Sequence, residues 1–208
     1  MNYREGLIKV YLDDLASKKP APGGGSAASL VGAVAASLVS MVANFTVGKE
    51  KFKEVEEEIK KVLEISERLR KELLELMDKD IEAYGEFSRA LKLPQKTEEE
   101  KRRKKKAIEE AIEKATQIPY QIMEKGREIL KLNEILLKKG NPRLLSDVKV
   151  SSELALASLL SAYFNVEINL PYLPQNRREY FQNTSRFLIA EAKELKKKLE
   201  RNEFSGKK

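Results

Sequence analysis

Residues 20–47 read PAPGGGSAASLVGAVAASLVSMVANFTV, and this stretch decides the fold. Two prolines and three consecutive glycines lie near its start, and the eighteen residues from Ser26 to Ala43 carry no charge. A helix that is apolar on every side is either enclosed by other helices or placed in a membrane. Eighteen residues reach the lower limit for a membrane span, but small residues keep the run weakly hydrophobic and the rest of the chain is dense in charge. We therefore expect a buried helix at the centre of a helical protein.

The glycines before this run predict a binding turn as well as a helix start. A helix N-terminus exposes unpaired backbone N–H groups, and these groups bind anions. Gly23, Gly24, Gly25 and Ser26 are therefore candidates for ligand contact, and a side chain at Gly24 should block a close approach to the backbone. The alternative is that the glycines only fit the chain into a crowded helix start.

Composition limits the chemistry that this chain can perform. Its 208 residues suit one domain, residues 1–208, and they include neither cysteine nor histidine. Disulfides, thiolate chemistry, an imidazole base and a His-ligated zinc are thereby excluded, so acid–base work falls to Asp, Glu, Lys or Tyr. The chain opens without a secretory signal, which predicts a cytoplasmic protein.

The charge balance says more about partners and source than about the fold. The net charge of +7 favours acidic partners, either an anionic metabolite or nucleic acid. The charged fraction of 35%, rich in Lys and Glu, with no Cys, His or Trp, is similar to that of proteins from thermophiles.

A long amphipathic helix is predicted over residues 49–90. Its apolar stripe alternates steps of three and four, as in a coiled-coil seam: Phe52, Val55, Ile59, Val62, Ser66, Leu69, Leu73, Leu76, Asp80, Ala83 and Phe87. Such a helix would be roughly 60 Å long, which exceeds what one small bundle needs. We therefore expect it to reach across a second copy of the chain in a homodimer.

The other helices follow from apolar spacing and from their end signals. We expect the buried helix to stop near Gly48, Pro119 to kink or restart a helix, and Ser146 to be an N-cap. The remaining helices are predicted over residues 2–16, 97–139, 148–168 and 177–201. No strand pattern is evident, so the fold is predicted to be all-α, a multihelical bundle.

The basic run from Lys101 to Lys106 lies behind a predicted capping box of Thr97 and Glu100. We expect i,i+4 ion pairs along it: Glu98–Arg102, Glu99–Arg103, Glu100–Lys104, Lys105–Glu109 and Lys106–Glu110. Because pairing would neutralise the run and no stacking aromatics accompany it, we favour a solvated helix face over a nucleic-acid patch.

Four polar residues depart from the pattern around them. Asp80 occupies a seam position, where a carboxylate must be paired, metal-bound or protonated. It is either a polar residue that fixes register or a functional carboxylate. Asn165 and Asn169 lie one turn apart in a hydrophobic helix end, and Asn44 lies near the end of the buried helix. These amides either cap neighbouring helices or face a polar heterocycle.

Four motifs in order resemble the cyclodeaminase/cyclohydrolase family: PAPGGGSAAS at 20–29, DIEAYGEFSRALKLP at 80–94, GNPRLLSDVKV at 140–150 and NVEINL at 165–170. That family includes the C-terminal half of formiminotransferase-cyclodeaminase and stand-alone bacterial methenyltetrahydrofolate cyclohydrolases. The resemblance covers about residues 3 to 172. It implies a dimeric helical domain with a buried central helix that binds a folate.

The resemblance also implies which residues form the site. Folate contact carries over to the glycine turn and to Asp80, Tyr84 and Lys92, and the later motifs contribute Asn141, Ser146, Asp147, Asn165 and Asn169. Gln95 stands where the family often has Lys, and Arg143 is a further departure. Both changes bear on contacts to a polyglutamate tail.

The implied reaction is hydrolysis of 5,10-methenyltetrahydrofolate to 10-formyltetrahydrofolate. Asp80 would stabilise the cation and accept the proton of water, with Tyr84 orienting it and Lys92 acting as an acid or balancing the substrate's carboxylates. No metal and no cofactor beyond the folate substrate is expected.

Three other readings stay open at this point. The first is cyclodeamination of 5-formiminotetrahydrofolate with release of ammonia, which needs similar groups. The chain is too short for an added formiminotransferase domain, which favours the hydrolase. The second is a non-catalytic folate-binding or scaffold protein, and the third is a nucleic-acid-binding helical dimer, which salt-dependent retention on DNA would reveal.

Overall fold

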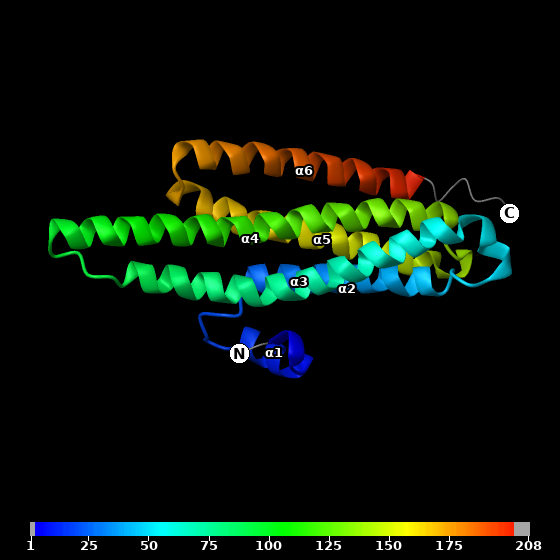
Figure 1. Ribbon diagram of the computed structural model, residues 1–208, viewed down its shortest axis with the longest axis horizontal. Helices are drawn as coiled ribbons and strands as arrows, with labels where there is room; N and C mark the ends of the chain where they lie inside the picture. Colours follow the sequence, from blue (N-terminus) through cyan, green and yellow to red (C-terminus); the bar gives the residue numbers. More distant parts are fainter. Residues whose placement is uncertain (1–2, 202–208) are drawn as a thin grey trace.

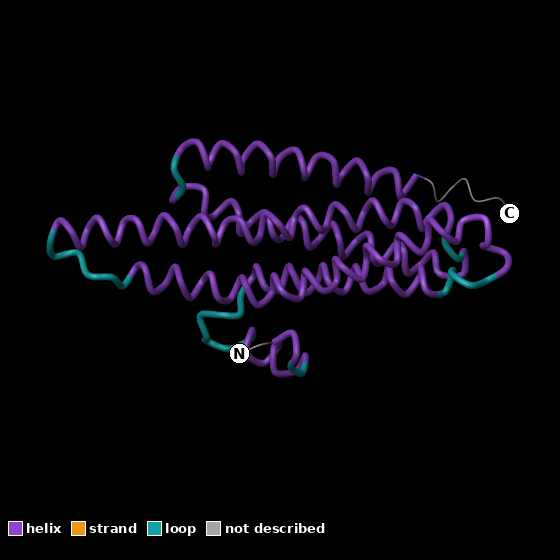
Figure 2. The backbone as a smooth tube through the Cα atoms, in the orientation of Figure 1, coloured by secondary structure: helices purple, strands orange, loops and turns teal. Residues whose placement is uncertain are grey.

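The computed structural model describes residues 3–201, and over this range it contains six α-helices and no strand. The helices are α1 (Ile8–Leu15), α2 (Gly24–Asn44), α3 (Glu56–Leu91), α4 (Glu98–Lys139), α5 (Leu145–Asn169) and α6 (Gln175–Arg201). Short 3₁₀ turns lie at Tyr3–Glu5, Glu50–Val55, Pro142–Leu144 and Leu170–Tyr172. Helices α2 to α5 run along the long axis, while α6 and α1 lie on opposite sides of them (Figure 1). The all-α prediction is confirmed, and loops are short and gather mainly at the ends of the bundle (Figure 2).

Helix α2 is the buried central helix that the sequence predicts. It packs against α3, α4 and α5, and its alanines at 35, 36 and 43 are fully buried. Its neighbours approach closely enough for side-chain hydroxyls to bond across to main-chain carbonyls. Ser158 donates to the Ala28 carbonyl at 2.7 Å, and Ser151 donates to the Ala35 carbonyl at 2.9 Å. By length and composition alone α2 could cross a membrane, but 61% of its most apolar window is buried.

The seam of α3 is buried as predicted, but the reason given for a second copy is wrong. Residues from Ile59 to Leu76 on the stripe are buried against α2 and α4 of the same chain. Helix α4 is itself 42 residues long, so it accompanies α3 over most of its length. The helix begins at Glu56 rather than at Lys49, because residues 50–55 form a 3₁₀ turn.

Three predicted boundaries differ from the structure. Helix α2 ends at Asn44, and Gly48 lies beyond it in a turn with φ of +74°, a conformation that favours glycine. Helix α4 runs through Pro119 without a restart. Helix α5 begins at Leu145 with Leu144 as its N-cap residue, so Ser146 lies inside the first turn and caps nothing there.

The capping box at the start of α4 is confirmed, and it changes the predicted ion pairs. The Glu100 carboxylate turns back to accept the backbone N–H groups of Lys96 and Thr97, at 2.6 and 3.1 Å. Glu98 pairs with Lys101 at 2.7 Å, and only the last two predicted pairs form, both at nearly 4 Å. Within residues 3–201, Arg102, Arg103 and Lys104 have no ion-pair partner, so pairing neutralises only part of the basic run.

Two helical glycines should respond oppositely to an added side chain. A Cβ at Gly126 would lie 3.0 Å from both the Ala155 carbonyl oxygen and the Leu159 Cβ, so Gly126→Val overpacks the α4–α5 contact and should cost about 1–3 kcal/mol. At Gly85 the nearest atom is the flexible end of Arg89 at 3.3 Å, so Gly85→Ala should stabilise the helix by about 0.5–1 kcal/mol. Urea unfolding of both variants measures the difference. Equal effects would contradict the close α4–α5 packing.

Candidate functional site

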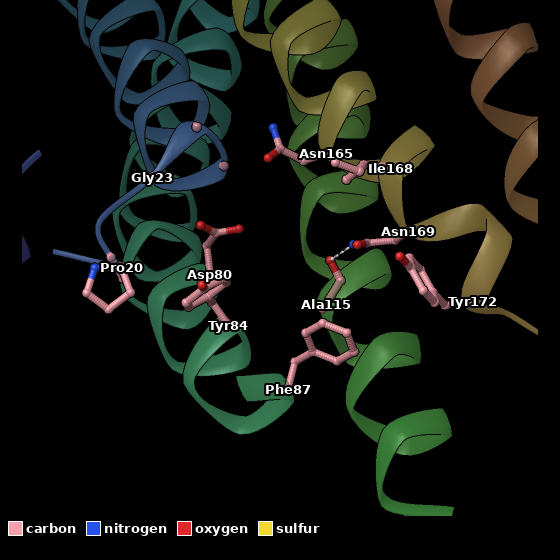
Figure 3. Close-up of a pocket in the computed structure, with 13 residues that line it drawn as sticks. Pro20, Gly23, Asp80, Tyr84, Phe87, Ala115, Asn165, Ile168, Asn169 and Tyr172 are labelled. Atoms are coloured by element: carbon pink, nitrogen blue, oxygen red, sulfur yellow. Dashed lines mark hydrogen bonds between the residues drawn. The ribbon is translucent and has the colours of Figure 1, made fainter. Parts of the chain in front are cut away.

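A cavity of about 380 Å³ lies where α2 begins, between α3, α4 and α5 (Figure 3). The turn before α2, the start of α2, helices α3 and α4, and the end of α5 with the following turn all contribute residues to its lining. Its lining comprises Pro20, Ala21, Gly23, Gly24, Gly25, Asp80, Tyr84, Phe87, Ala115, Asn165, Ile168, Asn169 and Tyr172. The glycine turn, Asp80 and both late asparagines therefore meet at one place.

The Asp80 carboxylate packs directly on the glycine turn. A Cβ built on Gly25 would lie 2.1 Å from Asp80 Oδ1, which no real side chain tolerates. The backbone N–H of Ser26 donates a hydrogen bond to the same carboxylate. The anion that we expected at this helix N-terminus is therefore the protein's own aspartate, and its charge is favoured by the helix dipole there.

The glycines are needed for space at one position rather than for backbone conformation. Gly23 is extended, with φ of −140°, and within residues 3–201 only Gly48 has a positive φ. A Cβ at Gly24 would make an ordinary contact of 3.5 Å with Asn165 Oδ1, and one at Gly23 would meet nothing within 4 Å. The crowded glycine is Gly25, which faces the carboxylate, while the block to ligand approach expected from a side chain at Gly24 stays a prediction.

The environment of Asp80 shifts its protonation towards neutral pH. Burial raises the pKa of Asp80 from 3.8 to about 6, and the hydrogen bond from the Ser26 N–H opposes part of that rise. The carboxylate is thus ionised at pH 7 yet much more basic than an exposed aspartate. A group with these properties suits general base catalysis.

Tyr84 and the two asparagines complete the polar part of the cavity. Tyr84 lies one turn along α3 from Asp80, and its side chain is half exposed. Asn165 donates to the Ser161 carbonyl at 3.0 Å, which leaves its Oδ1 towards Gly24. These groups offer a phenol and amides to a polar ligand.

Pro119 explains how Asn169 is held. A proline lacks the N–H that would bond to the carbonyl four residues earlier, which is that of Ala115. The freed Ala115 carbonyl instead accepts from Asn169 Nδ2 at 3.0 Å (Figure 3). The proline that we expected to kink or restart the helix therefore provides an anchor for a residue of the cavity.

Six of the predicted residues do not line this cavity, and the first of them, Ser26, is fully buried. Lys92 is exposed at the C-cap of α3. Asn44 ends α2, about 30 Å from Gly24 along the helix axis. Asn141 lies at that far end, donating to the Phe45 carbonyl at 3.2 Å and receiving the Arg143 N–H at 3.2 Å. Ser146 and Asp147 follow it in the first turn of α5.

Sequence reasoning missed the apolar walls of the cavity. Phe87 and Tyr172 meet edge to face with ring centroids 6.4 Å apart, and Ile168 lies nearby on α5. Phe87 was predicted as a seam residue, and its step of seven from Asp80 could have placed it on the same face. Aromatic and aliphatic walls of this kind suit a flat heterocycle, and no Lys or Arg among the described residues lines the cavity.

The comparisons with known proteins agree with one another. The family model described as formiminotransferase-cyclodeaminase matches residues 7–186. The chain is 45% identical over 162 residues to the methenyltetrahydrofolate cyclohydrolase of Methylorubrum extorquens, covering 78% of each protein. It is 30% identical over 166 residues to the formimidoyltransferase-cyclodeaminase of Rattus norvegicus, covering 80% of this chain but only 31% of that protein.

The fold has a close counterpart among solved structures. The crystal structure of formiminotetrahydrofolate cyclodeaminase from Thermotoga maritima superposes with a TM-score of 0.80 at 29% identity, covering 95% of this chain and 93% of the other. The resemblance carried by the four sequence motifs is thereby confirmed. The family match over most of the chain, together with a relative of similar extent, shows that this protein belongs to the formiminotransferase-cyclodeaminase family.

Proposed function

We propose that this protein is a folate-dependent one-carbon enzyme that hydrolyses 5,10-methenyltetrahydrofolate to 10-formyltetrahydrofolate. The observation that carries the proposal is a carboxylate, Asp80, whose pKa is raised to about 6 in a largely apolar cavity. The substrate class is supported by the relatives, since the Methylorubrum extorquens protein is named a methenyltetrahydrofolate cyclohydrolase. The folate is the substrate, and no separate cofactor is proposed.

Asp80 serves the reaction first as a charge and then as a base. Its negative charge stabilises the bound methenyl cation, more strongly in this partly dry cavity than it would in water. Water attacks the methenyl carbon and Asp80 accepts one of its protons, which gives a neutral tetrahedral adduct. The C–N5 bond then breaks, N5 receives the proton from Asp80, and the adduct hydroxyl loses its proton to solvent as the formyl group forms. The net reaction releases one proton.

The other cavity residues position the substrate. Phe87 and Tyr172 offer ring surfaces for the pterin, and the amides of Asn165 and Asn169 offer donors and acceptors to its polar edge. Tyr84 is placed to orient the water or the carboxylate. Lys92 lies beyond Phe87 at the C-cap of α3 and does not line the cavity, so its proposed role is with the anionic tail of the substrate.

Cyclodeamination of 5-formiminotetrahydrofolate is the second candidate. It is favoured by the Thermotoga maritima structure, which carries that name and covers nearly the whole of both chains. The two reactions are separated by incubating the purified protein with each folate and following methenyl absorbance. Loss of methenyl compound indicates the cyclohydrolase, and its appearance together with ammonia indicates the cyclodeaminase. No change with either folate would leave a non-catalytic folate-binding protein.

We also propose that the protein is a homodimer, for a reason other than the α3 seam. Helix α2 leaves one stripe partly or fully exposed, with heptad spacing: Ala27, Val31, Val34, Leu38, Met41 and Phe45. The neighbouring helix α5 leaves a second such stripe: Val150, Leu154, Ala157, Ser161, Phe164 and Ile168. Neither stripe contains a charge. The two-helix face measures roughly 600 Å² per protomer, which reaches the size of a specific interface.

Side-chain size supports an antiparallel pairing of the two α2 helices. The stripe grows from Ala27 through Val34 and Leu38 to Phe45. Antiparallel contact pairs small with large side chains and keeps the helices evenly spaced, whereas parallel contact would pair alanine with alanine and phenylalanine with phenylalanine. It would also bring the end that carries Asn44 and Asn141 beside the cavity of the other copy, which accounts for motif residues at both ends of the bundle.

A cytoplasmic location and a source adapted to high temperature are part of the same proposal. Composition supports the high-temperature source, through the absence of Cys and His and the high share of Lys and Glu. Neither a membrane nor nucleic acid is proposed as a partner.

The dimer is tested by a charge at the centre of the α2 stripe. Val34 is 46% exposed, so Val34→Glu should leave the monomer fold intact while burying an unpaired carboxylate in the interface. We expect a folded monomer by sedimentation velocity and circular dichroism. Phe187→Glu on α6, at a residue 65% exposed outside both stripes, is the matched control and should remain dimeric. If the Val34→Glu variant remains dimeric, the interface does not lie on the α2 stripe.

Replacement of the catalytic carboxylate tests the mechanism. Asp80→Asn keeps the shape but removes the charge and the basic oxygen, so turnover should fall by roughly two to four orders of magnitude. Folate binding should weaken much less. In the wild type, kcat/KM should decline as pH falls below about 6, because protonated Asp80 cannot accept a proton. Near-normal turnover by Asp80→Asn would remove Asp80 from the chemistry.

The same variant makes an independent prediction about stability. The folded-state pKa of Asp80 is above its ordinary value of 3.8, so its ionisation costs free energy of folding as pH rises towards about 6. Asp80→Asn should therefore be more stable than the wild type above pH 6, by at most about 3 kcal/mol, and no more stable near pH 3. Urea unfolding at both pH values measures this. A gain that is equal at the two pH values would contradict the raised pKa.

The fit between the glycine turn and the carboxylate is tested at Gly25. Gly25→Ala places a methyl group where Asp80 Oδ1 lies, so the carboxylate must move and turnover should fall at least tenfold. Gly23→Ala adds the same methyl group with nothing within 4 Å and should cost much less. Steady-state kinetics on both variants decides the point. Equal losses would mean that the turn needs glycine for ligand access instead.

A further inference from the structure

The N-terminal segment docks on α3 beside the cavity. Tyr3, Tyr11 and Met77 form a small hydrophobic cluster that is separate from the main core. The backbone N–H of Tyr3 donates to Asp78 at 3.1 Å, and Arg4 lies 3.6 Å from the same carboxylate. These contacts fall within one turn of Asp80 on the same helix.

Tyr11 is the one buried residue of α1. Its side chain is 3% exposed, whereas the neighbouring apolar residues Leu7, Ile8 and Leu12 are largely exposed. Its ring meets the Tyr3 ring edge to face at 5.4 Å. Packing alone would be served as well by phenylalanine, and a buried hydroxyl costs free energy unless it is hydrogen-bonded.

The Tyr11 hydroxyl lies 3.1 Å from Ser26 Oγ, and both groups are buried. Ser26 Oγ donates its one proton to the Gly23 carbonyl at 2.8 Å and accepts the Gly23 N–H at 3.2 Å. A hydroxyl has one donor and two acceptor positions, so the remaining position of Ser26 accepts the Tyr11 proton. Burial raises the pKa of Tyr11, which keeps that proton in place.

The bond to Ser26 connects α1 to the carboxylate. Ser26 closes the glycine turn through its side chain, and its backbone N–H donates to Asp80. The Tyr11 hydroxyl therefore fixes the residue whose amide points at the base.

We propose that Tyr11 is a positioning residue of the site, which holds the Ser26 amide beside the Asp80 carboxylate through the Ser26 hydroxyl. This inference rests on the proposed function in giving Asp80 the role of the base. Tyr11 itself touches neither substrate nor reacting atoms. The N-terminal helix thereby becomes part of the active site's support, although it adds little to the main core.

Few other groups act on Asp80. From α1 the titratable group near it is Tyr11, and from its own helix it is Tyr84. Helix α5 presents the neutral amides of Asn165 and Asn169, α4 presents Ala115, and the turn before α2 presents glycines. A change in the Ser26 hydrogen bond is therefore the main way in which α1 can alter the proton affinity of Asp80.

Tyr11→Phe is the direct test, because it keeps the ring and removes only the hydroxyl. A carboxylate that loses a hydrogen bond to its charged form holds its proton more tightly, so the Asp80 midpoint should rise by about half a pH unit or more. Carbon-13 NMR of the side-chain carboxyl carbons, with Asp80→Asn for assignment, reads this midpoint without any turnover. In kinetics, kcat/KM should fall about twofold or more at pH 6 and less at pH 8.

Tyr3→Phe is the matched control. It removes the Tyr3 hydroxyl, which bonds to Asp14, from the same segment and leaves the Tyr11–Ser26 contact intact. We expect a loss of thermal stability with the Asp80 midpoint unchanged. An equal shift of the midpoint in both variants, or none in Tyr11→Phe, would overturn the proposal and leave Tyr11 with a packing role.

A double-mutant cycle with Ser26→Ala completes the test. If Tyr11 acts through Ser26, Tyr11→Phe should add no further shift of the Asp80 midpoint in the Ser26→Ala background. A full additional shift would overturn the route through Ser26. Because the NMR midpoint needs no substrate, an inactive wild type would refute the proposed function while leaving this inference separately testable.

Discussion

The contact between the Asp80 carboxylate and the N-terminus of α2 joins the fold to the chemistry. The Asp80 carboxylate can approach the start of α2 this closely only because Gly25 has no side chain, and the Ser26 N–H that the helix leaves free interacts with that carboxylate. The same contact leaves Asp80 partly desolvated, which makes it more basic than an exposed aspartate. The start of the central helix and the proposed base of the reaction thus depend on one pair of groups.

Small residues on α2 make this arrangement possible along the rest of the helix. They let α5 approach closely enough for its serine hydroxyls to bond to carbonyls of the central helix, such as Ser158 to Ala28. Towards α3, the Ser29 hydroxyl of the central helix donates to the Leu73 carbonyl. The neighbours then hold the start of α2 and the end of α5 in fixed relation, so that Asn165 reaches Gly24. The outward face of α2 carries larger side chains, Leu38, Met41 and Phe45, where a second copy rather than the same chain is proposed to cover it.

Periodicity predicted much of the fold because helix geometry ties spacing to a face. The stripe on α3 identified its buried residues, and the uncharged run identified the central helix. Periodicity could not show whether an apolar surface is covered by the same chain or by a second copy. Helix α2 is apolar on nearly every side, so its sequence does not indicate which side faces a partner. Periodicity also could not place Lys92, which shares a helix with Asp80 but lies about 18 Å further along it. The asparagines at 44 and 169 look alike in sequence, yet tertiary docking sends them to opposite ends.

Pro119 shows why a local rule can fail and still be informative. A proline inside a helix removes one hydrogen bond, and the rule therefore predicts a break. In α4 the freed Ala115 carbonyl accepts a hydrogen bond from Asn169, about fifty residues later in the chain. This bond replaces the one that the proline removes, and the helix continues. That partner is invisible to any window of sequence around the proline. Ala115 and Asn169 both line the cavity. The Ala115 carbonyl, which the helix does not use, is therefore available to hold a side chain of the candidate site. A break in a local rule, rather than agreement with it, is what marks this wall as functional.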